Sequence, residues 1–221
     1  MRTVSFALGL AVMAWATCSG IARYSMVSFQ AHMLQHMALS MLAPLLLVLG
    51  APVSLVLAAL PAISEGHARS PRRWATALLH STYSRIVTHP VVVLAIFVSG
   101  LYGVYFTSLF DTLMGSHTGH LLMEVHFLLT GVLFAFTVIG IDPSPRPLPY
   151  GARLIMVLVA MSAHAFFAVA LMQAVTPIGA GWYAQVRPPW LTDPLADTYA
   201  GGGVAWAVGE IPTLLLLVVV A

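Results

Sequence analysis

The fold is decided by residues 31–49, AHMLQHMALSMLAPLLLVL, which contain no acidic or basic side chain other than histidine. Their length is close to the ~20 apolar residues that cross a bilayer as an α-helix. His32 and His36 stand four residues apart and therefore share one face of that helix, with Met33 and Met37 on the adjoining arc. Imidazole and thioether ligands suit copper, Cu(I) especially, better than calcium or magnesium. The stretch therefore predicts a metal site at the start of a membrane helix.

The composition places the whole chain in a membrane. Of its 221 residues 60% are hydrophobic and 7% are charged, and the mean hydropathy is +0.93, whereas roughly a quarter of the residues in a soluble domain are charged. We expect an all-α polytopic transmembrane helix bundle that forms a single domain over residues 1–221. The lone cysteine excludes an internal disulfide, the absence of lysine excludes a Schiff base, and the net charge of +2 gives no reason to expect nucleic acid.

About six membrane spans are visible, and the arginines orient them. Seven of the nine arginines fall at the N-terminus and in the second and fourth loops, so we expect the N-terminus to be cytoplasmic. Pro44 and Pro52 predict a kink or break in the second span. Because the chain ends inside an apolar run, we also expect it to be cut at one or both ends. The expected spans are 3–23, 31–49, 89–107, 118–139, 152–175 and 204–221.

A second polar cluster opens the fourth span, with the sequence HTGHLLMEVH at 117–126. His117, His120 and Glu124 share a helix face there, whereas His126 points to nearly the opposite side. Glu210 follows a run of three glycines in the last span. Counting ~1.5 Å of rise per residue from the expected helix starts places His36, Glu124 and Glu210 at one depth, about 10 Å from the outer face.

These positions give a set of candidate metal ligands on the non-cytoplasmic side. The set comprises His32, His36, His117, His120, Glu124, Met33, Met37 and Glu210. His126 and His164 are expected to make supporting polar contacts instead of binding the metal directly. The competing interpretation is structural, with the histidines as interhelical hydrogen-bonding groups and the methionines as core packing. Glu210 could equally pair with a histidine or with Arg187.

Two other functions fit parts of the pattern. His36 and His126, on different helices, could be the axial ligands of a b-type haem in a membrane redox module. Proton-coupled transport through Glu124 and Glu210 ranks last, because no inverted repeat is evident and the cluster lies at one mouth instead of the midplane.

Several motifs in fixed order carry a family resemblance. The chain is similar to the multi-pass cytochrome c oxidase assembly factors of the CtaG type, and the likeness covers nearly its whole length. The motifs are the residues 32–37 with LGAPV at 49–53, HTGH at 117–120 followed by HFLLTG at 126–131, DPSP at 142–145, HAFF at 164–167, and GGGVAW at 201–206 with GEIP at 209–212.

The resemblance implies a seven-helix protein of the bacterial plasma membrane that is needed to mature a haem–copper oxidase at the stage of copper insertion. Our first hypothesis is therefore a non-enzymatic copper chaperone that hands copper to an oxidase subunit. In actinobacteria such proteins can be fused to a copper-resistance-D-like domain, which makes a copper-transport membrane domain a candidate partner. The family does not settle the copper ligands, so the ligand set above rests on helical geometry alone.

Overall fold

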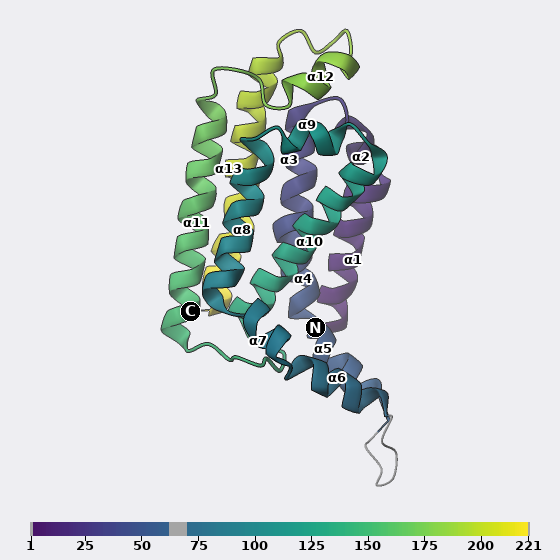
Figure 1. Cartoon of the computed structure of the whole chain (residues 1–221), viewed down its shortest axis with the longest axis vertical. Helices are drawn as coiled ribbons and strands as arrows, with labels where there is room; N and C mark the ends of the chain where they lie inside the picture. Colours follow the sequence, from purple (N-terminus) through teal and green to yellow (C-terminus); the bar gives the residue numbers. More distant parts are fainter. Residues whose placement is uncertain (1, 62–69, 221) are drawn as a thin grey trace.

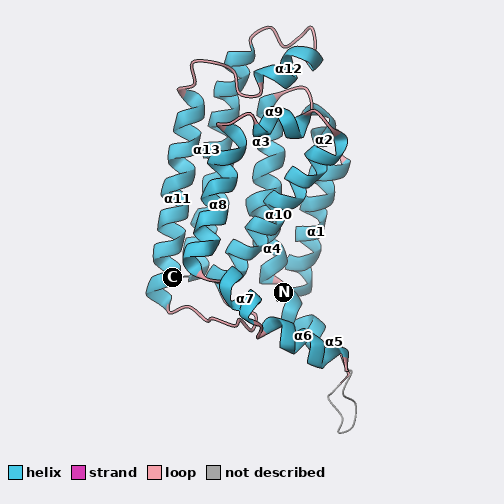
Figure 2. Ribbon diagram, viewed as in Figure 1, coloured by secondary structure: helices cyan, strands magenta, loops and turns pink. Residues whose placement is uncertain are grey.

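The computed structural model describes residues 2–61 and 70–220, and within these ranges it contains helices and loops and no strand (Figure 2). The expected all-α bundle is therefore confirmed. The long segments run along the length of the molecule, with both chain ends at the same end of the bundle (Figure 1). These segments are α1 (Arg2–Cys18), α3 (Phe29–Met37) continued by η1 (Ala38–Leu42) and α4 (Ala43–Leu49), α8 (Pro90–Tyr105), α10 (His117–Ile139), α11 (Tyr150–Met172) and α13 (Pro194–Val220).

Short helices close the two ends of the bundle. One end carries α2 (Gly20–Tyr24), α9 (Leu109–Met114) and α12 (Ala180–Val186), and the other carries α5 (Pro52–Ala59), α6 (Pro71–Leu79) and α7 (Thr82–Val87) (Figure 1). Four of the six expected spans are long and apolar enough to cross a bilayer, namely Phe29–Leu49, His117–Ile139, Tyr150–Met172 and Pro194–Val220. The other two, α1 and α8, are apolar but shorter. The first expected span ends early because Ser19 accepts a hydrogen bond from Ile21 N and begins α2.

Both predicted breaks in the second span are present. Pro44 has no N–H to donate to the carbonyl of Ser40, and the helix widens just there into the π-helical turn η1. That carbonyl packs directly against Gly131 on α10, where any side chain would collide with it. At Pro52 the chain turns through Ala51, which has a left-handed φ of 53°, and α5 begins.

The N-terminus of α3 is capped from another helix. Asp197 on α13 accepts hydrogen bonds from Phe29 N at 2.6 Å and from Ser28 Oγ at 2.9 Å. A carboxylate at this position pairs the free N–H groups of the first helical turn and complements the helix dipole. This contact fixes the level at which the histidines of α3 stand relative to α13.

The other aspartates do the same elsewhere. Asp142 accepts from Ser54 N at 2.8 Å at the start of α5, and Asp111 accepts from Trp182 N at 2.8 Å at the start of α12. Asp193 accepts from the first turn of α13. All four aspartates of the chain therefore cap helices. Only the glutamates remain as acidic candidates for a functional site.

Three consecutive glycines let α13 pack closely between its neighbours. A Cβ on Gly201 would lie 2.6 Å from the ring of Phe29 on α3, and one on Gly202 would lie 2.8 Å from Met172 on α11. A Cβ on Gly203 would meet nothing within 4 Å. The triplet thus has two packed members and one open member.

This asymmetry makes a matched test of the packing. Gly202→Ala should destabilise the protein by about 1–3 kcal/mol, because the added methyl overpacks the contact with α11. Gly203→Ala should be neutral or stabilising by up to ~1 kcal/mol, because alanine favours the helix. Denaturant unfolding in detergent micelles measures both, and equal effects of the two variants would contradict the packing.

Candidate functional site

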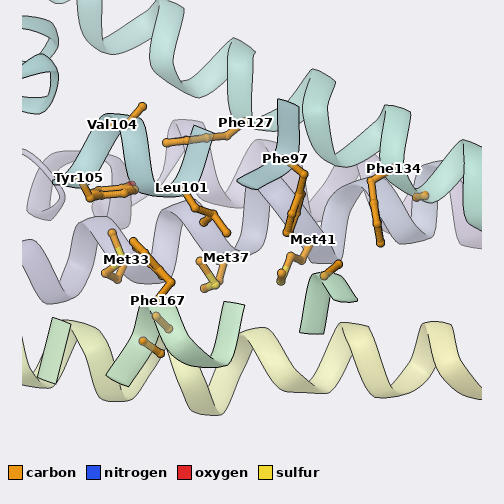
Figure 3. Packing of buried hydrophobic residues seen from close by; sticks show 14 of the residues in the cluster. Met33, Met37, Met41, Phe97, Leu101, Val104, Tyr105, Phe127, Phe134 and Phe167 are labelled. Atoms are coloured by element: carbon orange, nitrogen blue, oxygen red, sulfur yellow. The ribbon is translucent and has the colours of Figure 1, made fainter. Parts of the chain in front are cut away.

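The histidine face of α3 is turned into the bundle. His32 and His36 are each 3% exposed, and Met33 and Met37 beside them are fully buried. Figure 3 shows these two methionines and Met41 following one another along the buried cluster. The face predicted from the sequence is therefore an interior face.

His32 is held by residues of two other helices. Its Nε2 lies 2.9 Å from the hydroxyl of Tyr105 on α8, and its ring centroid lies 5.1 Å from that of Phe110 on α9. The ring of His120 on α10 lies 6.1 Å away, centroid to centroid. The Nδ1 atom of His32 has no hydrogen-bond partner among the described residues. The structure therefore brings the predicted residues of α3 and α10 into neighbouring positions.

His36, one turn deeper, packs its ring against aromatic side chains. The centroid of Phe127 lies 3.9 Å away in an edge-to-face arrangement, and that of Tyr105 lies 5.5 Å away. Within residues 2–61 and 70–220, neither ring nitrogen of His36 has a hydrogen-bond partner. Burying such a group without a hydrogen bond costs about 1–3 kcal/mol, so this side chain is costly to keep here on structural grounds alone.

Glu124 is paired through a residue that the sequence analysis did not single out. Gln35 Nε2 donates to Glu124 Oε1 at 2.6 Å and to the carbonyl of Ala16 at 3.0 Å, so it ties α1, α3 and α10 together. Glu124 Oε1 also lies 3.6 Å from His120 Nδ1. The sequence signal for Gln35 is an amide side chain inside an otherwise apolar run.

His164 on α11 is more central than expected. Its side chain is 0% exposed, and neither ring nitrogen has a hydrogen-bond partner in the described part of the chain. Gly209 on α13 packs directly on the ring, and any side chain at that position would collide with it. Six unpartnered ring nitrogens therefore lie in the described interior: His32 Nδ1, His36 Nδ1 and Nε2, His120 Nε2, and His164 Nδ1 and Nε2.

Three other candidates do not belong to this series of buried imidazoles. His117 is exposed at the start of α10, and His126 is exposed on the opposite side of that helix, as the helical wheel predicts. The predicted depth of Glu210 is wrong, because α13 begins at Pro194 and not near residue 204. Sixteen residues into the helix, Glu210 lies about 24 Å from its start. Within the described residues its Oε2 accepts a hydrogen bond from Thr213 Oγ1 at 3.5 Å, and its Oε1 is buried without a partner.

The ligands are not gathered into a finished metal site. Within residues 2–61 and 70–220, no three His, Cys, Asp or Glu side chains stand close enough together to hold a metal ion as they are placed. The histidines instead form a descending series through the interior, from His120 and His32 to His36 and His164. Binding a metal here requires side-chain rotation.

The end of the bundle above His32 is closed. The Tyr183 hydroxyl of α12 donates to the carbonyl of Ser25 at 3.1 Å, and its ring centroid lies 6.0 Å from that of Phe110. Burial, and after it the carboxylates of Asp197 and Asp111, hold the pKa of Tyr183 well above its ordinary value. The hydroxyl therefore stays a neutral donor, and α12 stays fastened over the histidines.

Apolar spans around an interior series of histidines define a polytopic α-helical membrane protein with a buried imidazole site. The chain belongs to the family of cytochrome c oxidase caa3 assembly factors, whose model matches residues 1–221. The resemblance inferred from the motifs is thereby confirmed.

The relatives are mycobacterial proteins described as uncharacterised. Those of Mycobacterium bovis and Mycobacterium tuberculosis are 42% identical to this chain over 217 residues, and that of Mycobacterium leprae is 44% identical over 217 residues. Each match covers 98% of this chain, which spans about a third (33%) of the length of the curated relatives it matches. No solved structure matches the chain.

The contact between Tyr105 and His32 can be tested by itself. Tyr105→Phe should lower the free energy of unfolding by about 1–3 kcal/mol, because it leaves a second nitrogen of His32 buried without a partner. Tyr150→Phe is the control, since Tyr150 is exposed and makes no side-chain hydrogen bond within the described residues. Unfolding in detergent measures both variants, and an unchanged stability of Tyr105→Phe would contradict the hydrogen bond.

Proposed function

We propose that this chain is a non-enzymatic assembly factor that binds copper at its buried histidines and hands it to a subunit of a haem–copper oxidase. The observation that carries the proposal is the set of six unpartnered imidazole nitrogens in the bundle interior. Buried polar groups are normally hydrogen-bonded, and lipid supplies no partner. A metal ion received from outside would satisfy them.

The donor set suits copper in its reduced state. Imidazole nitrogens alternate along α3 with the thioethers of Met33 and Met37, and soft sulfur ligands favour Cu(I). We assign His32, His36 and His120 as ligands and add His164, whose two nitrogens are both free. Glu124 has a different role in this proposal.

Glu124 orients a ligand instead of binding the metal. Its carboxylate is held by Gln35 and faces His120 Nδ1, which leaves His120 Nε2 free. A carboxylate behind a ligating imidazole fixes the ring and raises its basicity. Gln35 therefore supports the site through Glu124.

The haem alternative has less support. His36 and His126 do line one cavity, but its free volume is about 10 Å³, which is room for about one water molecule. A porphyrin between these two residues would require α8 and α10 to separate.

We place the protein in the bacterial plasma membrane with the N-terminus cytoplasmic. The arginine distribution supports this orientation, with seven of nine on the N-terminal side. The end closed by α9 and α12 then faces outward, on the side where we propose that the oxidase subunit receives its copper.

Copper affinity tests the proposal directly. His36→Ala and His164→Ala should each weaken Cu(I) binding by about tenfold or more, since even residues that only support a metal ligand are worth that much. The measurement is competition with a chromophoric Cu(I) chelator, using purified protein. His120→Ala should behave in the same way.

The control is His80→Ala, which removes an exposed histidine at the opposite end of the bundle. Its Cu(I) affinity should equal that of the wild type. Unchanged affinity in all the buried-histidine variants would contradict the proposal. A Soret band in the purified wild-type protein would favour the haem alternative instead.

A further inference from the structure

Two cavities meet at the imidazole of His126. An outer groove of about 330 Å³ lies between α8, α9 and α10, and its lining includes Gly100, Gly103 and His126. An inner cavity of about 10 Å³ is lined by Gly100, His126 and His36. Because His126 and Gly100 line both spaces, they form the partition between the groove and the buried site.

Gly100 is what allows His126 to lie there. A Cβ at position 100 would stand 2.8 Å from His126 Nε2, which is closer than such atoms approach without one of them moving. The imidazole therefore lies directly on the backbone of α8. One turn further on, a Cβ at Gly103 would meet nothing within 4 Å, so that glycine lines the groove without contacting the ring.

His126 is an unusual residue for this surface. It lies nine residues into a membrane-spanning helix, about 14 Å from its start, and its side chain is exposed on the outside of the bundle. None of the described residues makes a hydrogen bond to its ring. Hydrocarbon supplies no partner either, and polar residues at such depth are by default functional.

His36 lies on the inner side of this partition. His36 is 3% exposed, lines the inner cavity, and has two unpartnered nitrogens. The route from His36 to the bundle end, by contrast, is covered by Tyr105, Phe110 and Tyr183. On the sideways route, His126 and Gly100 separate the inner cavity from the outer groove.

We propose that His126 is an exchange ligand through which copper passes sideways between His36 and the lipid-facing groove. The step is a ligand exchange, in which a bond from Cu(I) to the His126 nitrogen forms as one to His36 breaks, and the metal keeps its oxidation state. This inference rests on the proposed function and deepens it, because it implies an acceptor ligand that approaches within the bilayer.

The test separates exchange through the membrane from exchange through water. Cu(I)-loaded protein in lipid nanodiscs is mixed with bathocuproine, which is uncharged and partitions into lipid, or with its water-soluble disulfonate. In His126→Ala, removal of copper by bathocuproine should slow by about tenfold or more, whereas removal by the disulfonate and the equilibrium Cu(I) affinity should stay within about twofold of the wild type.

Two glycine variants provide a matched pair. Gly100→Ala displaces the His126 ring and should slow the removal of copper by bathocuproine as much as His126→Ala does. Gly103→Ala lines the same groove without touching the ring and should behave as the wild type. Equilibrium Cu(I) affinity, measured for each, confirms that the site has folded.

Two results would overturn the exchange role and leave the proposed function standing. One is an unchanged bathocuproine rate in His126→Ala. The other is a loss of equilibrium affinity as large as that of His36→Ala, which would make His126 a ligand of the resting site. A wild-type protein that binds no Cu(I) would overturn both proposals together.

Discussion

Polar side chains inside a bilayer have to find their hydrogen-bond partners within the protein, because hydrocarbon offers none. The aspartates meet this requirement at helix starts, and the bond from Asp197 to Phe29 N sets the level of α3 within the bundle. Glu124 meets it through Gln35. The buried imidazoles of His36 and His164 do not meet it. Among the described residues, the aspartates all cap helices, whereas these imidazoles lie buried without a partner. We infer that the bundle is organised to receive a ligand at them.

The features that the sequence predicts well are local ones. The spacing of His32 and His36 places them on one face, and Pro44 and Pro52 predict the breaks that the structure has as a π-helical turn and as the start of α5. The His120 and Glu124 pair follows from the same helical spacing. Each of these depends on neighbours within a few residues along one helix, which is the information a single sequence carries.

The remaining features depend on which helices become neighbours. The partnership of Tyr105 with His32 joins α8 to α3 and has no local signal. The burial of His164 depends on α13, whose Gly209 packs directly against the imidazole ring. The depth of Glu210 is different, because its signal is local. Asp193 followed by Pro194 is a typical helix start, and α13 begins there and not at the later glycines.

The central claim is that the buried imidazoles are copper ligands, and X-ray absorption at the copper edge of the Cu(I)-loaded protein tests it most directly. The account predicts the multiple-scattering pattern of more than one imidazole, and fewer imidazoles in His36→Ala. A coordination shell without imidazole, or a spectrum identical in the wild type and in His36→Ala, would contradict it.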